Sequence, residues 1–180
     1  MTRLSVNLNK VALLRNARAG HAPSVVDAAR TCIAAGAHGI TLHPRPDARH
    51  ATAQDVFAVA MLLERTPGVE LNVEGNPFHG LVEIVRRARP AQCTLVPDDP
   101  AARTSDHGWH LARDGERLAP IVAELRAAGA RVSLFMDAGS AELEAAKALG
   151  ADRIELYTEP YAAAHGGARS GATLARFAAT

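Results

Sequence analysis

The sequence predicts an α/β fold, and more narrowly a parallel (β/α)8 TIM barrel of which about six βα units are present. Short extended runs alternate with helical patterns at about 25–35 residues per unit, which indicates parallel strands joined by crossover helices. Several runs alternate polar and apolar residues, whereas strands covered by helices on both faces are continuously apolar. No glycine-rich GxGxxG or GxxxxGKS/T turn follows a run, which argues against a nucleotide-binding sheet.

Six strands are predicted, and several of them place polar side chains on one face. They cover residues 4–9, 39–43, 69–74, 92–97, 131–137 and 153–158. In the second strand Thr41 and His43 share the face opposite Ile40 and Leu42, because side chains alternate along a strand. The same alternation in the first, third and sixth strands predicts one enclosed polar interior, with the apolar faces packed on an outer ring of helices.

Six helices are predicted between and after these strands. They cover residues 24–35, 53–65, 79–89, 115–128, 141–149 and 172–179. Ser24 and Ser140 stand where helix N-caps are expected. The segments AAGAHG, AAGA and ALGA place a glycine where a helix turns back into a strand.

These elements form a single domain, residues 1–180, which no linker or low-complexity segment divides. A closed barrel of this kind has about eight units, and the pattern yields about six. We therefore expect units 7 and 8 to be absent through C-terminal truncation, which amounts to roughly 50–60 residues at this spacing. The alternative is a fold other than the eightfold barrel.

Composition and spacing exclude several classes of function. The formal charge is +1, from 20 basic and 19 acidic residues, so no overall field attracts nucleic acid or a membrane surface. No run of about 18 apolar residues predicts a membrane span, and no secretory leader opens the chain. Cys32 and Cys93 lack metal or redox spacing, and His107 and His110 lack partner carboxylates at a known metal-ligand spacing. We expect a cytoplasmic protein without a metal site.

The stretch GITLHPRPDARH, residues 39–50, ends a buried strand in a group of cations. Barrel enzymes place reacting groups where strands end, which makes His43 a candidate general base. Arg45, Arg49 and His50 then form a short loop able to hold a phosphate through charge-assisted hydrogen bonds. The two prolines of the stretch stiffen this loop and lower the entropy lost on binding.

Further candidates follow other strands. Glu74 is the second catalytic candidate, because a carboxylate on an inward face must be paired or functional. Asn7, Asn9 and Lys10 end the first strand, and Arg18 lies just beyond it, toward the same mouth.

The segment PDDPAARTSDHGWHLAR, residues 97–113, lacks periodicity, and a loop of this length is typical of a lid or binding loop. Thr104 offers a hydroxyl there. The alternative interpretation of the candidates is structural: a hydrogen-bonded strand-end histidine at residue 43, asparagines that satisfy loop backbone, and a solvated loop at Arg49 and His50. Their convergence on one mouth favours the functional interpretation.

Several motifs together resemble the pyridoxine 5'-phosphate synthase family. They are SVNLNKVALLRNAR, AGAHGITLHPRPDARH, LNVEGNP, TLVPD followed by TSDHG, RVSLFMDA and ADRIELYTEPYA. The match runs in order from Leu4 to about Ala164.

The resemblance implies a (β/α)8 barrel that condenses 3-amino-2-oxopropyl phosphate with 1-deoxy-D-xylulose 5-phosphate to pyridoxine 5'-phosphate, phosphate and water. It implies small phosphorylated substrates, no cofactor and a homo-oligomer. Carried over by motif, the proton acceptors are His43 and Glu74. The contacts to the xylulose phosphate are Arg45, His50 and Thr104, and those to the amino-ketone phosphate are Asn7 and Arg18.

Two departures from the family pattern leave alternatives open. Asn9 and Lys10 stand where the family usually has an Asp-His pair, and the AGH motif that carries the family's proton-donor histidine after the seventh strand does not follow the sixth predicted strand here. One alternative is a truncated, non-catalytic relative that acts through association of exposed strand edges. Another is a different sugar-phosphate barrel enzyme such as an aldolase, for which Lys10 is the one lysine near a strand end.

Overall fold

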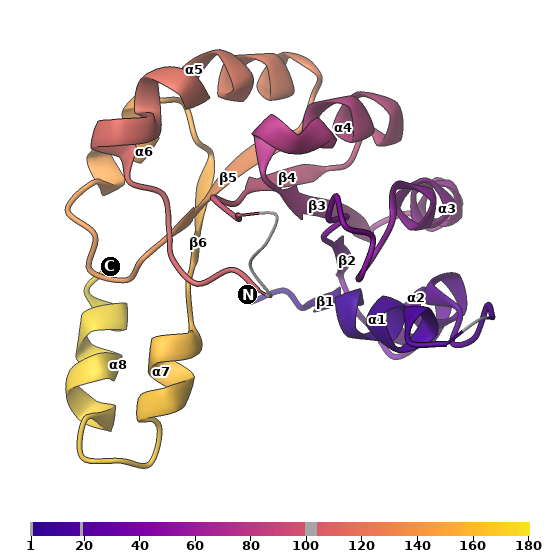
Figure 1. The fold of residues 1–180 in the computed structure, drawn as a ribbon, viewed down its shortest axis with the longest axis horizontal. Helices are drawn as coiled ribbons and strands as arrows, with labels where there is room; N and C mark the ends of the chain where they lie inside the picture. The colour runs from indigo at the N-terminus through magenta and orange to yellow at the C-terminus, as the bar shows by residue number, and fades with distance from the viewer. Residues whose placement is uncertain (1, 19, 100–103) are drawn as a thin grey trace.

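The computed structural model describes residues 2–18, 20–99 and 104–180, which contain a curved six-stranded parallel sheet (Figure 1). The strands are adjacent in chain order, from β1 at one edge to β6 at the other. Their bounds are β1 (Ser5–Asn7), β2 (Gly39–Leu42), β3 (Glu70–Gly75), β4 (Gln92–Leu95), β5 (Arg131–Met136) and β6 (Arg153–Leu156). This half-barrel is the architecture of a partial (β/α)8 barrel and confirms the predicted fold class.

Helices between the strands cover the convex side of the sheet, and two more follow the last strand (Figure 1). They are α1 (Asn9–Asn16), α2 (Val25–Ala34), α3 (Ala53–Leu63), α4 (Val82–Ala88), α5 (Leu111–Ala127), α6 (Leu143–Ala148), α7 (Glu159–Ala164) and α8 (Ser170–Ala178), with a short π-type turn η1 (Pro77–Leu81) before α4. The last two helices form a hairpin that projects from the end of β6 (Figure 1). Within it the rings of Tyr161 and Phe177 pack with centroids 5.7 Å apart.

The polar interior expected from the strand alternation is present on the concave side. Ser5 Oγ and Thr41 Oγ1 lie 2.8 Å apart between β1 and β2. Asn72 on β3 donates to Thr41 Oγ1 at 3.4 Å and accepts from Thr94 Oγ1 on β4 at 3.2 Å. The opposite faces of the same strands are buried against the helices, and their fully buried side chains include Ile40, Leu42, Val73, Val132 and Leu134. The interior is thus a hydrogen-bonded polar layer rather than a packed apolar core.

The first strand is shorter than predicted, and a helix follows it at once. Asn9 was expected at the strand end but is the first residue of α1, where its N–H donates to Asn7 Oδ1 at 2.9 Å. The sequence interpretation missed α1 because Ala12 is the one buried residue of this helix, which leaves no wide apolar stripe to detect. A bidentate ion pair between Arg15 and Asp55 ties α1 to the first turn of α3.

Most other boundaries differ from the prediction by only one or two residues, but three differences are larger. The start of α5 lies at Leu111 rather than Gly115, because the Glu142 carboxylate accepts hydrogen bonds from the N–H groups of Leu111 (2.9 Å) and Ala112 (2.8 Å). The predicted helix 79–89 is interrupted by the η1 turn, where Gly80 has φ +84°. The short helix α7 was not predicted.

The two predicted N-caps fared differently. Ser24 caps α2 by accepting a hydrogen bond from the Asp27 N–H at 3.1 Å, which confirms that prediction. Ser140 was wrong as a cap for α6, since the N-cap position of that helix is Glu142.

The loop between β4 and α5 is fixed against the end of β5. Trp109 donates its indole N–H to Leu95 O and its backbone N–H to Phe135 O, both at 2.8 Å. Gly108 approaches β5 so closely that a Cβ atom there would lie 2.3 Å from the Asp137 nitrogen. Residues 100–103 of the predicted loop lie outside the described residues. The described part brings Thr104 and Ser105 to the mouth of the half-barrel.

Candidate active site

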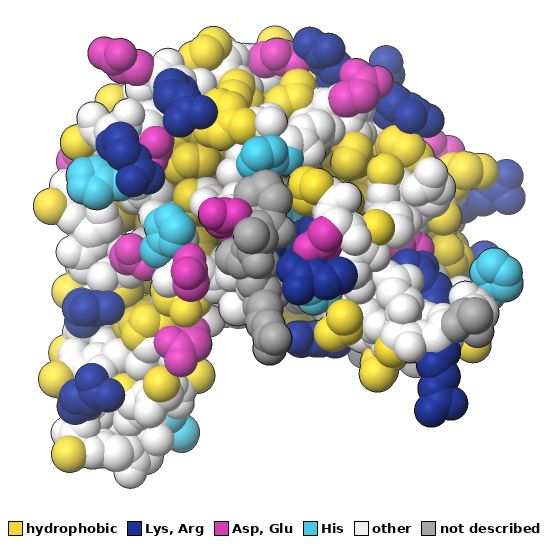
Figure 2. All heavy atoms as spheres, viewed as in Figure 1, with side chains coloured by type: hydrophobic (Ala, Val, Ile, Leu, Met, Phe, Trp, Pro, Cys, Tyr) yellow, Lys and Arg dark blue, Asp and Glu magenta, His cyan; other side chains and the backbone are white. Residues whose placement is uncertain are grey.

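Two adjoining cavities open at the carboxyl ends of the strands. The first, of about 300 Å³, is lined by Asn7, Asn9, Lys10, His43, Arg45, His50, Thr104 and Ser105. The second, of about 360 Å³, adds Glu74, Glu155 and Tyr157 and shares His43 with the first. On the face shown in Figure 2, acidic, basic and histidine side chains gather near its centre. The structure therefore brings together the site residues that the sequence suggested except Arg18 and Arg49, neither of which lines these two cavities.

Arg18 is exposed on the bend that follows α1. Arg18 is not among the described residues that line the two cavities. The sequence prediction of a contact from Arg18 thus stays a prediction.

His43 follows β2 and is held on several sides. Its backbone N–H donates to Asn9 Oδ1 at 2.8 Å. Its Nε2 lies 3.1 Å from Asp98 Oδ2, and its Nδ1 lies 4.0 Å from Glu74 Oε2. The side chain is only 10% exposed. The imidazole is therefore fixed between two carboxylates, with one ring nitrogen toward each.

Arg45 meets the same carboxylate as His43. Its Nη1 donates to Asp98 Oδ2 at 3.0 Å, and its Nη2 donates to the backbone oxygen of Asp99 at 3.1 Å. The side chain is 4% exposed. His43 and Arg45 point the same way from the chain, as their spacing predicted, but they converge on an aspartate rather than on open space.

Asp98 was missed by the sequence interpretation, although it directly follows the fourth strand. Burial acts to raise the pKa of Asp98, but hydrogen bonds from His43 and Ser105 and the charge of Arg45 outweigh it and hold this pKa below its ordinary value. Asn76 donates to the Asp98 backbone oxygen at 2.8 Å and fixes the loop. The strand-end rule that selected Glu74 also applies to Asp98.

Glu74 and Glu155 form an acidic pair in the lumen. Burial raises the pKa of Glu74 well above its ordinary value, and the nearby charges of Glu155 and Asp98 add to the shift. Burial also raises the pKa of Glu155. Asn72 donates to Glu74 Oε1 at 3.2 Å. Two neighbouring buried carboxyl groups disfavour double ionisation, so the pair holds a proton to higher pH than an isolated carboxyl group would.

The loop after β2 is shaped by Asn16, a residue that the sequence interpretation also missed. Its side-chain amide donates to the backbone oxygens of Ala48, Arg49 and His50 at 2.8–3.0 Å. These bonds turn the carbonyl groups of the loop toward α1. Asn16 has no strand-end position and belongs to no periodic pattern, and its partners lie far away in the sequence. Its role is therefore visible only in the folded structure.

His50 and Lys10 complete the polar wall of the first cavity. Burial lowers the pKa of His50, and the charges of Arg45 and Lys10 lower it further. Nδ1 of His50 is buried without a hydrogen-bond partner among the described residues. A neutral imidazole beside a lysine offers a donor and a cation to an anionic group.

The arrangement suits proton transfer next to an anionic ligand. A fixed imidazole and a carboxyl group of raised pKa can each take up and return a proton, and the cations lie in the adjoining cavity. Within the described ranges, no three histidine, cysteine or acidic side chains group as a metal site. None of the described helices is long and apolar enough to cross a membrane.

Comparison with known proteins identifies the family of this chain. Residues 4–180 match the family model described as "Pyridoxal phosphate biosynthesis protein PdxJ". A pyridoxine 5'-phosphate synthase of Xanthomonas campestris pv. campestris (strain B100) is 59% identical, with 98% of this chain and 72% of the relative covered. Enzymes with that name from Xanthomonas oryzae pv. oryzae (strain PXO99A) and Albidiferax ferrireducens are 55% and 53% identical, over 98% and 99% of this chain and 72% and 73% of the relative. The chain belongs to the PdxJ family.

Proposed function

We propose that this chain acts as a pyridoxine 5'-phosphate synthase. The reaction condenses 3-amino-2-oxopropyl phosphate with 1-deoxy-D-xylulose 5-phosphate and releases inorganic phosphate and water. The observation that carries the proposal is the buried imidazole of His43 between Glu74 and Asp98, beside a cavity lined by cations, in a member of this family.

His43 acts as a proton acceptor whose orientation depends on Asp98. An ionised Asp98 accepts a hydrogen bond from Nε2–H, so the lone pair of the neutral ring lies on Nδ1. This tautomer follows from the hydrogen-bond partners. When the ring takes up a proton, the carboxylate stabilises the resulting imidazolium.

Glu74 is the second proton acceptor and can also return a proton. Its raised pKa makes the protonated form persist to higher pH than in an ordinary glutamate, which suits a group that both takes up and returns a proton. Imine formation, phosphate elimination and ring closure each need removal and return of protons. Glu155, which lines the same cavity and also has a raised pKa, can share a proton with Glu74.

The first cavity receives a phosphorylated substrate. Arg45, His50 and Thr104 contact the xylulose phosphate, and Lys10 and Asn9 border the same space. Lys10 supplies a charge there but not a titrating imidazole. Asn7 and Arg18 serve the phosphate of the amino-ketone substrate, and Arg18 must move toward the mouth to do so, since it lies outside both cavities.

The test is a two-substrate assay. Both phosphorylated substrates are mixed with the protein, and pyridoxine 5'-phosphate and inorganic phosphate are measured together. The proposal expects the two products to appear in equal amounts and only when both substrates are present. Phosphate release from one substrate alone would instead assign a phosphatase or lyase activity and contradict the proposal. Borohydride trapping of a Lys10 adduct would favour an aldolase-type reaction.

We also propose a cytoplasmic, homo-oligomeric enzyme. The free cysteines Cys32 and Cys93 suit a reducing compartment. Sedimentation velocity of the purified protein tests the assembly: a single species larger than 18.9 kDa supports it, and a monomer contradicts it.

A further inference from the structure

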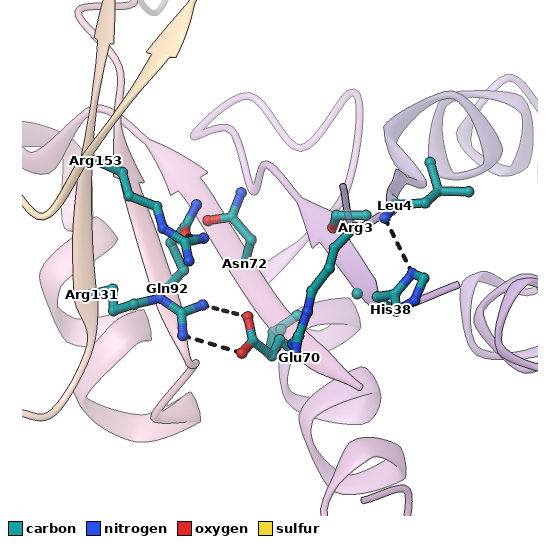
Figure 3. Close-up of a pocket in the computed structure, with 11 residues that line it drawn as sticks. Arg3, Leu4, His38, Glu70, Asn72, Gln92, Arg131 and Arg153 are labelled. Atoms are coloured by element: carbon teal, nitrogen blue, oxygen red, sulfur yellow. Dashed lines mark hydrogen bonds and ion pairs between the residues drawn. The ribbon is translucent and has the colours of Figure 1, made fainter. Parts of the chain in front are cut away.

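A third cavity lies at the opposite mouth of the half-barrel, at the amino ends of the strands. Its volume is about 480 Å³. Its charged lining residues are Arg3, Glu70, Arg131 and Arg153, with His38 and Gln92 beside them (Figure 3). None of the residues that line it also lines the two cavities at the carboxyl ends. It is therefore separate from the candidate active site.

The strand register brings the arginines into this cavity. Arg131 opens β5 and pairs with Gln92 on β4, and Arg153 opens β6 and pairs with Ser133. These four residues face the lumen, because side chains alternate along each strand. Gly39 lets Ser5 approach the wall of the cavity closely, since a Cβ atom on residue 39 would lie 2.9 Å from Ser5 Oγ. The amino-terminal layer of the lumen is thus cationic, whereas the layer around Glu74 is acidic.

The positive charge of the cavity exceeds what its one acid can neutralise. Glu70 accepts two hydrogen bonds from Arg131, drawn as the paired dashed lines in Figure 3. These bonds and the charges of Arg131, Arg3 and Arg153 lower the pKa of Glu70, so the carboxylate stays ionised and pairs with one guanidinium. Arg153 donates to the neutral amide oxygen of Gln92 at 2.9 Å. Two guanidinium charges therefore remain without a carboxylate inside the cavity.

His38 offers a neutral donor at the same place. Its Nδ1 accepts a hydrogen bond from the Leu4 N–H at 3.2 Å, so the proton of the neutral ring lies on Nε2. The cavity thus combines guanidinium forks, an imidazole donor and open space. Guanidinium forks match the tetrahedral oxygens of phosphate through paired, charge-assisted hydrogen bonds.

We propose that this amino-terminal cavity is a second anion site, which binds a phosphate group between Arg3, Arg131 and Arg153. The phosphate comes from free inorganic phosphate or from a small phosphate monoester, and the volume leaves room for a sugar-sized remainder. The site stands apart from the catalytic cavities and does not depend on the proposed reaction.

The test follows the arginine Nε–H resonances of the protein by NMR during two titrations. One titration uses inorganic phosphate and the other uses ribose 5-phosphate, each against sodium chloride at matched ionic strength. The proposal expects saturable shifts of the Arg131 and Arg153 resonances that chloride does not reproduce. Saturation by both probes, by phosphate alone or by the ester alone supports the site and identifies the source of the phosphate.

The matched variants are the double substitution R3Q/R153Q and the control R30Q. Arg30 lies on α2, where its side chain is 63% exposed and away from the cavity. The double variant should weaken phosphate binding at this site by roughly tenfold or more, since each lost bond is charge-assisted. The control should bind as the wild type does. Shifts confined to residues of the catalytic mouth, or equal binding by the double variant, would overturn the proposal.

Discussion

Nε2 of His43 and Nη1 of Arg45 lie 3.1 Å and 3.0 Å from the same oxygen of Asp98. One buried carboxylate thus joins the candidate base to the candidate phosphate-binding arginine. Both side chains are held in place before any substrate arrives, which lowers the entropy lost when the reacting geometry forms.

Replacing Asp98 by Asn should slow turnover. The amide keeps the size of the carboxylate but carries no charge to stabilise a protonated His43 or to fix its tautomer. We expect kcat to fall by on the order of 10²-fold, with a smaller change in KM. Steady-state kinetics check this, with Asp27→Asn as the control, because that side chain is 77% exposed on α2. An effect on KM alone would show that Asp98 acts only through Arg45.

Replacing Glu74 by Gln should separate activity from stability. We expect kcat to fall by about 10²- to 10⁴-fold, because a general base is lost. The pKa of Glu74 is raised in the folded protein, so the folded state binds the proton more tightly than the unfolded chain. Stability is therefore lost as pH rises from the unfolded value through the raised folded value.

Denaturant unfolding at several pH values measures the second effect. The Glu74→Gln protein should be more stable than the wild type at about pH 8 and close to it at about pH 4, where both side chains are neutral. Glu83→Gln on α4, with a side chain 65% exposed in the wild type, serves as the control without this pH dependence. A wild type that is the more stable of the two at about pH 8 would contradict the assigned shift.

Replacing Arg45 by Lys should weaken substrate binding. A lysine keeps the charge but cannot reach both Asp98 and the backbone oxygen of Asp99 with a planar fork. We expect KM for the xylulose phosphate to rise by about tenfold or more. The control is Arg49→Lys, since Arg49 is 42% exposed and pairs with Asp47 on the same loop; its KM should stay within about threefold of the wild type. An equal rise in KM for both variants would contradict a specific role of Arg45 in substrate binding.

Replacing Gly108 by Ala should displace the loop that carries Thr104 and Ser105. The added Cβ atom meets the backbone of Met136 and Asp137 at 2.3–2.6 Å, which no rotamer relieves. We expect a loss of about 1–3 kcal/mol in the free energy of unfolding. Gly171→Ala on α8 is the matched control, because nothing lies within 4 Å of its Cβ position. Thermal unfolding of the two variants compares them, and equal midpoints would contradict the close approach.

Sequence patterns predicted the strands and most site residues for a physical reason. Alternation along β2 and β3 reports which side chains share the lumen, and the barrel rule then places His43, Arg45 and Glu74 at one mouth. The helix α1 was not predicted, because Ala12 is its one buried residue and a single buried position gives no helical repeat of apolar residues. Patterning thus reports wide buried faces well and missed a helix whose buried face is narrow.

The roles of Asp98 and Asn16 could not be read from sequence spacing. Asp98 meets His43 and Arg45 across 53 or more positions, and Asn16 holds carbonyl groups more than 30 positions away. Such contacts depend on how the strands curl. The amino-terminal cavity was missed for another reason. The alternation predicted in the sixth strand puts polar residues on the inward face, but that Arg153 lies near Arg3 and Arg131 becomes visible only when the register is known.

The most direct test of the account is kcat for His43→Ala in the two-substrate assay, measured beside its thermal unfolding midpoint. The account predicts a fall in kcat of on the order of 10²-fold or more, because the base that faces Glu74 is gone. The unfolding midpoint should move by only a few degrees, as is common when one polar side chain is truncated. A variant that turns over as fast as the wild type would contradict the assignment of His43 as a proton acceptor.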